Sequence, residues 1–216
     1  MVSKKFNLVS SLLFVLLFAA SGINAQDSKL LDKEDMAFLR ELTKAVLDSS
    51  RILPGQIISK DFGPNNTGGI LIRPGGRDAY PSFWIRDYAM SLESGMVNRM
   101  EQLHMLQLTA ATQCDQTWIT RNGSMVPLGA IADHIRIDDG QPIYFPGSYD
   151  VAEQGNKQYG MTPPYDDQFF FIHMAYYYIH NTADTKYLRQ VINGMRLIDR
   201  LETAFRVPPS HKDNHI

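Results

Sequence analysis

Cysteine is almost missing from this chain. Cys114 is the single one among 216 residues, which excludes an internal disulfide and any zinc site built from several cysteines. Folding must therefore rest on a hydrophobic core, which a chain of this length can supply. Cys114 is expected to be a small buried residue of that core. A lipid anchor needs a cysteine directly after a leader peptide, and the sequence has none there.

An excess of charge of either sign is also missing. The chain has 21 basic and 23 acidic side chains, a net charge of −2 with neutral histidines, and no basic cluster of the kind that binds nucleic acid. It lacks a glycine-rich phosphate loop, a nucleophile elbow and a zinc signature. His211 and His215 have a metal-binding spacing, but they lie in a polar tail where we expect no metal site. We therefore predict neutral partners, no nucleic acid, no metal and no cofactor.

Long apolar runs are confined to the N-terminus. Lys4 and Lys5 precede an apolar stretch over residues 8–20, and small residues follow it as far as Ala25. This order is typical of a cleavable signal peptide. The stretch is shorter than the run of about 20 apolar residues that a membrane-spanning helix needs. We predict cleavage near Ala25, which leaves residues 26–216 as an exported chain, periplasmic or extracellular, without a stable membrane anchor.

Helical periodicity recurs in four segments, over residues 32–50, 88–113, 166–179 and 185–205. The first has Asp32 placed to cap it, and one face carries an apolar stripe. The second contains Gly95 and Asn98, either of which can divide it. The third is apolar nearly all round, which predicts a helix packed on most of its sides, whereas the fourth is apolar along a single stripe.

A buried helix followed by an amphipathic one predicts an inner and an outer layer. A helical hairpin is laid into a two-layered toroid in this way, although a bundle with one central helix fits the same pattern. Residues 51–80 form a long loop rich in proline, glycine and asparagine, with one short strand at residues 70–72. Residues 118–159 contain turns at Asn122-Gly123 and Asp139-Gly140, which indicate short strands.

An aromatic cluster leads from the loop into the second helix, in the segment YPSFWIRDYAM over residues 80–90. A sugar pocket needs an aromatic face for C–H groups and charged planar groups that bind neighbouring hydroxyls. Trp84, Arg86 and Asp87 supply both kinds of group. In the structural alternative Asp87 caps the helix, Arg86 pairs with an acid, and Trp84 belongs to the core.

Acidic residues also open the third helix. Asp166 and Asp167 follow Tyr165 there. In the structural interpretation Asp166 is the N-cap and Asp167 is a first-turn acid that complements the helix dipole. This interpretation does not exclude a binding role, because helix ends are where loops build a site.

Two segments carry a family resemblance. FWIRDYAMSL, residues 83–92, resembles the W-x-R-D element of the six-hairpin glycosidases, particularly the glucoamylase-like families, in which the Arg-Asp pair binds sugar hydroxyls. PYDDQFFFI, residues 164–172, is similar to an element that opens an inner helix in the same superfamily, and Ala183 replaces the usual glycine of the following T-G-D-like turn. The resemblance covers about residues 80–201.

The resemblance implies a mainly α fold, a partial (α/α)6 toroid built of helical hairpins with long loops and short strands between them. It implies an inverting glycoside hydrolase acting on oligo- or polysaccharides. The implied substrate-binding residues are Trp84, Arg86, Asp87, Tyr165, Asp166 and Asp167.

The catalytic carboxylates are not identified. Six hairpins at about 12 residues per helix need well over about 250 residues, so we expect only the N-terminal portion of a toroid here. Inversion uses a general acid and a general base about 6.5–9.5 Å apart, and in this superfamily later hairpins supply them. The remaining acidic candidates, each expected on the surface or in a turn, are Glu93, Asp138, Asp139 and Glu153.

Two other functions stay open. One is a non-catalytic, exported glycan-binding protein, or an inactive truncated relic, in which Trp84 and the tyrosines form a stacking platform. The other is a polysaccharide lyase or sugar epimerase on a similar toroid. That activity needs a histidine or tyrosine base in the cavity, and His173 and His180 are the histidine candidates, although we expect both to pack structurally.

Overall fold

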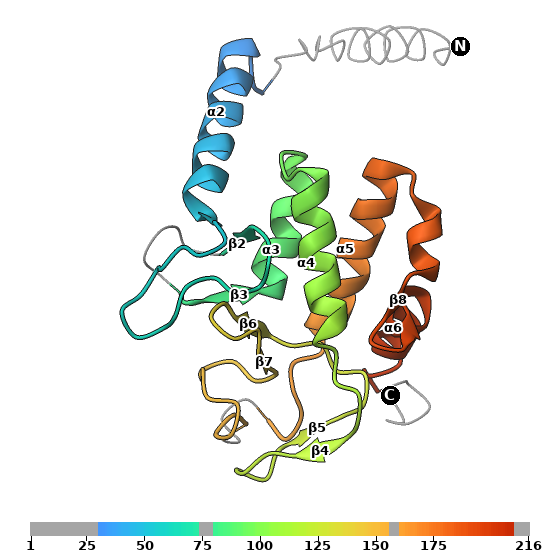
Figure 1. Ribbon diagram of the computed structural model, residues 1–216. Coiled ribbons are helices and arrows are strands. Elements are labelled where there is room, and N and C mark those ends of the chain that lie inside the picture. Colours follow the sequence, from blue (N-terminus) through green and yellow to red (C-terminus); the bar gives the residue numbers. More distant parts are fainter. Residues whose placement is uncertain (1–29, 74–79, 156–159, 210–216) are drawn as a thin grey trace, which may run out of the picture. The chain divides into compact units, whose positions relative to one another are not determined.

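The computed structural model describes residues 30–73, 80–155 and 160–209 (Figure 1). The chain divides into two compact units, one ending at Arg40 and the other beginning at Glu41. The described part is mainly helical, as predicted. Within it, no helix is long and apolar enough to cross a membrane. The predicted signal peptide, and His211 and His215, lie outside the described residues.

Helix α2 (Lys33–Ser50) confirms the first helical prediction. Oδ1 of Asp32 accepts hydrogen bonds from the backbone N–H groups of Glu34 and Asp35, at 2.7 and 2.9 Å, so the predicted cap is present. The apolar stripe, however, is largely exposed, with Phe38 66% and Val46 54% accessible. The periodicity therefore predicted the helix correctly, but it does not show that the stripe belongs to the core.

The second predicted helix is divided at both expected positions. Helix α3 (Ile85–Ser91) and the short 3₁₀ helix η1 (Leu92–Ser94) end at Gly95, which has a left-handed φ of 67°. Helix α4 (Arg99–Ala111) begins after Asn98. Asn98 Oδ1 accepts a hydrogen bond from the Glu101 N–H at 3.0 Å, and the Glu101 carboxylate accepts one from the Asn98 N–H at 3.1 Å. This reciprocal capping box fixes the start of α4.

Helix α5 (Asp166–Thr182) packs on most of its sides, as predicted, and its exposed residues are few. It packs against α3, α4 and α6, and Figure 1 shows α3, α4 and α5 side by side. On its open side Phe169 and Tyr176 are 49% and 60% accessible. The buried residues are Asp167, Gln168, Phe171, Met174, Ala175 and Tyr178.

The fourth predicted helix, over residues 185–205, is wrong for its first half. The chain forms a 3₁₀ helix η2 (Thr185–Arg189), then a hairpin of β8 (Val191–Ile192) and β9 (Met195–Arg196), and only then α6 (Leu197–Phe205). Asn193 and Gly194 between the strands have positive φ angles of 46° and 81°. A two-residue turn of this kind joins antiparallel strands and ends a helix.

Short strands complete the fold, as predicted for the loop regions. β1 (Arg51–Ile52) pairs with β2 (Leu71–Ile72), and β4 (Trp118–Ile119) pairs with β5 (Met125–Val126) around the predicted turn at Asn122-Gly123. A three-stranded antiparallel sheet has the order β3-β6-β7. Its strands are β3 (Ser82–Trp84), β6 (His134–Arg136) and β7 (Pro142–Ile143), with the predicted turn at Asp139-Gly140 before β7.

The three-stranded sheet positions Trp84 and the start of α3. β3 leads directly into α3, and in the register of β3 and β6 Trp84 lies opposite His134. The N–H of Ile85 donates to the carbonyl oxygen of Asp133 at 3.2 Å, which continues the pairing into the first residue of α3. The core includes Cys114, as expected, and large side chains such as Phe83 and Phe171.

Candidate functional site

The two segments singled out in the sequence meet at Arg86. Its Nε lies 3.2 Å from Oδ2 of Asp166, although the two residues are separated by 80 positions (166 − 86). Arg86 belongs to the first turn of α3 and Asp166 is the first residue of α5, and these helices pack against each other. Both side chains are 42% accessible. The pair is therefore reachable from solvent.

Asp133 is a third member of this group, and sequence reasoning missed it. Its carboxylate is fully enclosed, with Oδ1 3.7 Å from Nη2 of Arg86 and Oδ2 2.8 Å from Nδ1 of His134. A buried carboxylate needs such partners, because an unpaired charge away from water is costly. One signal was present in the sequence. Asp133 and His134 interrupt an otherwise apolar run, AIADHI, over residues 130–135.

Trp84 lies on β3 and is half-buried. Its indole stacks on the imidazole of His134, with ring centroids 4.4 Å apart and an interplanar angle of 21°. Tyr80 makes an edge contact with Trp84 at 5.5 Å, and Tyr149 makes one with His134 at 5.1 Å. Trp84 is therefore part of an aromatic cluster at the edge of the carboxylate group.

Asp167 lies on the buried side of α5 and is 1% accessible. Burial raises the pKa of its carboxyl well above the usual range, and the negative charges of Asp133 and Asp166 raise it further. The positive charge of Arg86 opposes this rise. Asp167 consequently holds its proton to a higher pH than an exposed aspartate does.

The structural alternative is wrong about the N-caps and right in two other parts. The N-cap residue of α3 is Trp84 and that of α5 is Tyr165, and neither makes a side-chain capping hydrogen bond. Asp167 does lie in the first turn of α5, and Arg86 does pair with an acid. Asp87 lies in the first turn of α3. The pKa of its carboxyl is raised, because the loss of surrounding water has a larger effect than the positive charge of Arg86, which lowers the pKa. The hydroxyl of Tyr165 lies 3.0 Å from Oγ1 of Thr162, so it is engaged within the loop before α5.

Several buried polar atoms near the cluster have no hydrogen-bond partner within the described residues. Such groups destabilise a fold by about 1–3 kcal/mol each when nothing satisfies them. Donors and acceptors are both represented among these enclosed atoms. The atoms belong to Ser82, Trp84, Asp133, His134, Asp167 and Gln168.

The remaining acidic candidates are structural or exposed. Asp138 and Asp139 both pair with Arg136, at 2.9 and 3.2 Å, and the hydrogen bond from Arg136 lowers the pKa of Asp138. Glu153 pairs with Arg121 on the surface at 3.6 Å. In the described ranges, no three histidine, cysteine, aspartate or glutamate side chains are grouped so as to hold a metal.

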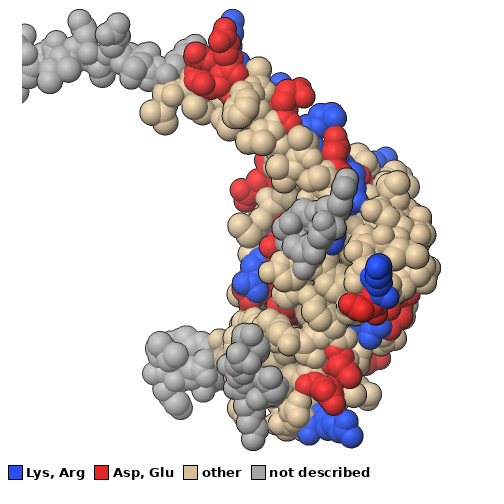
Figure 2. All heavy atoms as spheres, turned by 90° about the vertical axis from the view of Figure 1, so that its left-hand side faces the viewer, with Lys and Arg blue, Asp and Glu red and all other residues tan. Residues whose placement is uncertain are grey.

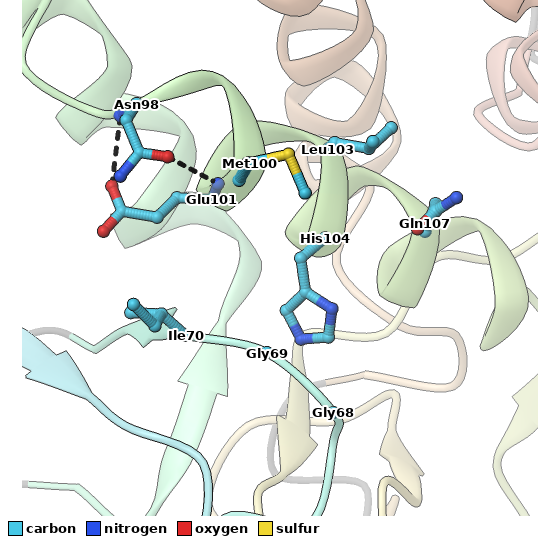
Figure 3. A pocket seen from close by; sticks show the side chains of 9 residues that line it. All are labelled: Gly68, Gly69, Ile70, Asn98, Met100, Glu101, Leu103, His104 and Gln107. Atoms are coloured by element: carbon cyan, nitrogen blue, oxygen red, sulfur yellow. Dashed lines mark hydrogen bonds between the residues drawn. The ribbon is translucent and has the colours of Figure 1, made fainter.

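A pocket of about 310 Å³ lies elsewhere, between the loop at residues 68–70 and α4. Figure 3 shows His104 extending from α4 toward Gly68 and Gly69. Its Nε2 lies 3.2 Å from Oγ1 of Thr67, and burial lowers its pKa. Glu101, on the pocket wall, is already bound to Arg51 at 2.6 Å. The predicted site residues do not line this pocket, so we place the candidate site at Arg86.

Surface charge agrees with the composition. On the face drawn in Figure 2, basic and acidic side chains are interspersed, and the described residues in view form no broad basic area. The Arg86 group is different, since Asp87, Asp133, Asp166 and Asp167 all act on a site that holds one guanidinium. The site is therefore locally acidic.

Comparison of the chain with models of protein families, with curated proteins and with solved structures finds no match.

Proposed function

We propose that this chain is an exported carbohydrate-active protein and that the Arg86 group is a sugar-binding subsite of an inverting glycoside hydrolase. The observation that carries the proposal is the pairing of Arg86 with Asp166 beside Trp84. The two segments that resemble the six-hairpin glycosidases are far apart in the sequence, and they contribute side chains to one accessible group.

The fold supports the finer proposal of a partial (α/α)6 toroid. Helix α5 contacts α3, α4 and α6, as an inner helix of such a ring does. Its open side carries the exposed aromatic residues Phe169 and Tyr176. In a toroid this side of an inner helix faces the next hairpin.

The exposed groups match the surface of a sugar. Arg86 offers planar N–H donors, and the carboxylates of Asp87 and Asp166 offer acceptors, so two neighbouring hydroxyls can each donate and accept. Trp84 supplies an aromatic edge at the same place. A pyranose has equatorial hydroxyls and an apolar C–H face, which these groups complement.

The charge of the site favours a neutral sugar over an acidic one. Three carboxylates around one guanidinium, with Asp167 keeping its proton, repel a uronate, which polysaccharide lyases need as substrate. His173 and His180 lie 7 and 14 residues beyond Asp166 on α5, about 10 and 21 Å along the helix axis. Neither histidine is therefore placed to act as a base at Arg86, and His134, which does lie at the site, is fully buried.

Glycan binding without catalysis is the second candidate function. Hydrolysis by inversion requires a general acid and a general base on opposite sides of the bond. Asp167 retains a proton but is enclosed, while Asp133 and Asp166 are paired with Arg86. Because these carboxylates are enclosed or paired, they favour a binding role. The general acid and the general base are not assigned.

The test is isothermal titration calorimetry of the full chain with maltotriose and cellotriose, with trigalacturonate as the acidic comparator. We expect a neutral trisaccharide to bind and trigalacturonate not to bind. Release of reducing sugar in the same samples separates a hydrolase from a glycan-binding protein. Binding of trigalacturonate alone would contradict the proposed substrate class.

Two variants examine the site itself. Arg86→Lys and Asp87→Asn should each weaken trisaccharide binding about tenfold, because each removes a charge-assisted hydrogen bond, while Tm stays near the wild-type value. Arg196 and Asp199 form an exposed pair at 2.6 Å, and Arg196→Lys and Asp199→Asn are the matched controls. A large fall in Tm with binding intact would assign Arg86 and Asp87 a structural role instead.

A further inference from the structure

Asp133 lies between the two parts of the candidate site, the Arg86 guanidinium and the stacked rings of His134 and Trp84. One carboxylate oxygen faces the Arg86 guanidinium and the other accepts a hydrogen bond from His134, at 3.7 and 2.8 Å. Its backbone carbonyl accepts the N–H of Ile85, so the chain at Asp133 is fixed to the start of α3. Because its side chain is fully enclosed, Asp133 cannot itself touch a ligand in this structure.

The Asp133 contact also fixes the orientation of the His134 ring. Nδ1 of the imidazole lies 2.8 Å from Oδ2 of Asp133, and with a carboxylate as its partner this nitrogen is the donor. The ring is then held between two aromatic groups, stacked on Trp84 at 4.4 Å and in edge contact with Tyr149 at 5.1 Å. The orientation of the indole therefore depends on His134, and the orientation of His134 depends on Asp133.

We propose that Asp133 is a positioning residue, whose charge attracts the Arg86 guanidinium across 3.7 Å and whose contact with His134 orients the aromatic group Trp84. The sugar that these groups would contact rests on the proposed function. The positioning itself does not, because it can be measured without a ligand. Removing Asp133 should disturb both Arg86 and Trp84, whereas removing only its charge should disturb Arg86 alone.

The sequence has two tryptophans. The test uses the full chain with Trp118→Phe, so that Trp84 is the only tryptophan left. Asp133→Asn keeps an oxygen that accepts from His134 Nδ1–H but loses the charge facing Arg86. Asp133→Ala loses both, and His134→Gln removes the stacked ring. Asp139→Asn, an acidic residue of the same sheet region that pairs with Arg136, is the control.

Two readouts need no sugar. The fluorescence emission of Trp84 should be unchanged in Asp133→Asn and shifted in Asp133→Ala and His134→Gln. The rate at which phenylglyoxal modifies Arg86, followed by mass spectrometry of its peptide, should rise about threefold or more in Asp133→Asn and Asp133→Ala, because the guanidinium loses its enclosed partner. The Asp139→Asn control should match the parent in both.

The outcomes separate the two proposals. Unchanged Trp84 emission in His134→Gln together with an unchanged Arg86 modification rate in Asp133→Asn would overturn the positioning role, whether or not a sugar binds and whether or not Asp133→Ala folds. If both readouts change as expected but no trisaccharide binds to the parent, the proposed sugar fails and the positioning role stands. If a trisaccharide binds, Asp133→Asn should weaken it about tenfold.

Discussion

Arg86 and Asp166 approach to 3.2 Å from the first turns of two helices that are separated by more than 70 residues of chain. The contact is accessible from solvent, and the enclosed carboxylate of Asp133 also faces the same guanidinium. The guanidinium of Arg86 therefore lies between an exposed and a buried carboxylate. This arrangement suits recognition of hydroxyl groups.

Asp166→Asn should separate binding from stability. Both members of its pair are 42% accessible, so the free energy of unfolding should change by less than about 1 kcal/mol. The affinity for a neutral trisaccharide should fall about tenfold, because the ligand loses an ionised acceptor and Arg86 loses its orientation. Chemical denaturation and calorimetry measure the two quantities.

A double-mutant cycle with Arg86→Lys examines whether Asp166 and Arg86 act together. The combined loss of affinity should be smaller than the sum of the two single losses, since each substitution already breaks the pair. Asp199→Asn combined with Arg86→Lys is the control and should show additive effects. Additivity in the Asp166 cycle would mean that the pair is incidental to binding.

The local features of the fold were predictable from the sequence. Asp32 caps its helix, Gly95 and Asn98 divide the second helical segment, and the turns at Asn122-Gly123 and Asp139-Gly140 join short strands. Each depends on the backbone preferences of one or two residues. The Asn193-Gly194 turn has the same signal, yet the apolar stripe that runs through it favoured an uninterrupted helix.

The tertiary partners were not predictable in the same way. Asp133 becomes a partner of Arg86 only because β6 pairs with β3, which brings it beside the first turn of α3. The exposure of Phe169 and Tyr176 depends on how many helices surround α5. The interrupted apolar run over residues 130–135 marks Asp133 as unusual, but it does not identify Arg86 as its partner. The Arg86 and Asp166 segments were found separately, and only the fold places them in one group.

Gly69→Ala should destabilise the loop beside the pocket. A Cβ atom at this position would lie 2.4 Å from Cγ of His104, which is closer than any van der Waals contact. Accommodating it requires the imidazole to move and to lose its contact with Thr67. We expect a loss of about 1–3 kcal/mol in the free energy of unfolding, measured by urea denaturation.

The same substitution in a His104→Ala background is the control for this clash. With the imidazole removed, the additional cost of Gly69→Ala should fall below about 0.5 kcal/mol, because the three atoms nearest to the new methyl group all belong to the imidazole. An equal cost in both backgrounds would show that the backbone, rather than His104, excludes a side chain at Gly69.

Asn65→Ala should be more damaging than the same change one residue later. Nδ2 of Asn65 donates to the carbonyl oxygens of Ile52 and Gly69, at 3.1 and 2.9 Å, and its Oδ1 accepts the N–H of Thr67 at 3.1 Å. Removing this buried amide leaves backbone groups unpaired and should cost about 2–3 kcal/mol. Asn66 is exposed and makes one side-chain hydrogen bond, to Asp138. Asn66→Ala should cost less than about 1 kcal/mol in the same denaturation experiment.

Asp167 should make the protein less stable as the pH rises. Its pKa is raised in the folded chain well above the ordinary value of 3.8. Below pH 3.8 both folded and unfolded chains are protonated at this residue, so it contributes no pH dependence. Above that pH the unfolded chain releases the proton first, and the free energy of unfolding falls until the pH exceeds the folded pKa.

Asp167→Asn removes this titration, so the stability of the variant relative to the wild type should increase between pH 4 and pH 7. The absolute stability of the variant matters less than this change, because the new amide also lacks partners. Asp199→Asn is the control with the opposite sign, since a hydrogen bond from Arg196 lowers the pKa of Asp199. Its stability relative to the wild type should not rise over the same range. Parallel stability curves for the wild type and Asp167→Asn, measured by urea denaturation, would mean that solvent reaches Asp167 and that the carboxylate group around Arg86 is open to water on its inner side.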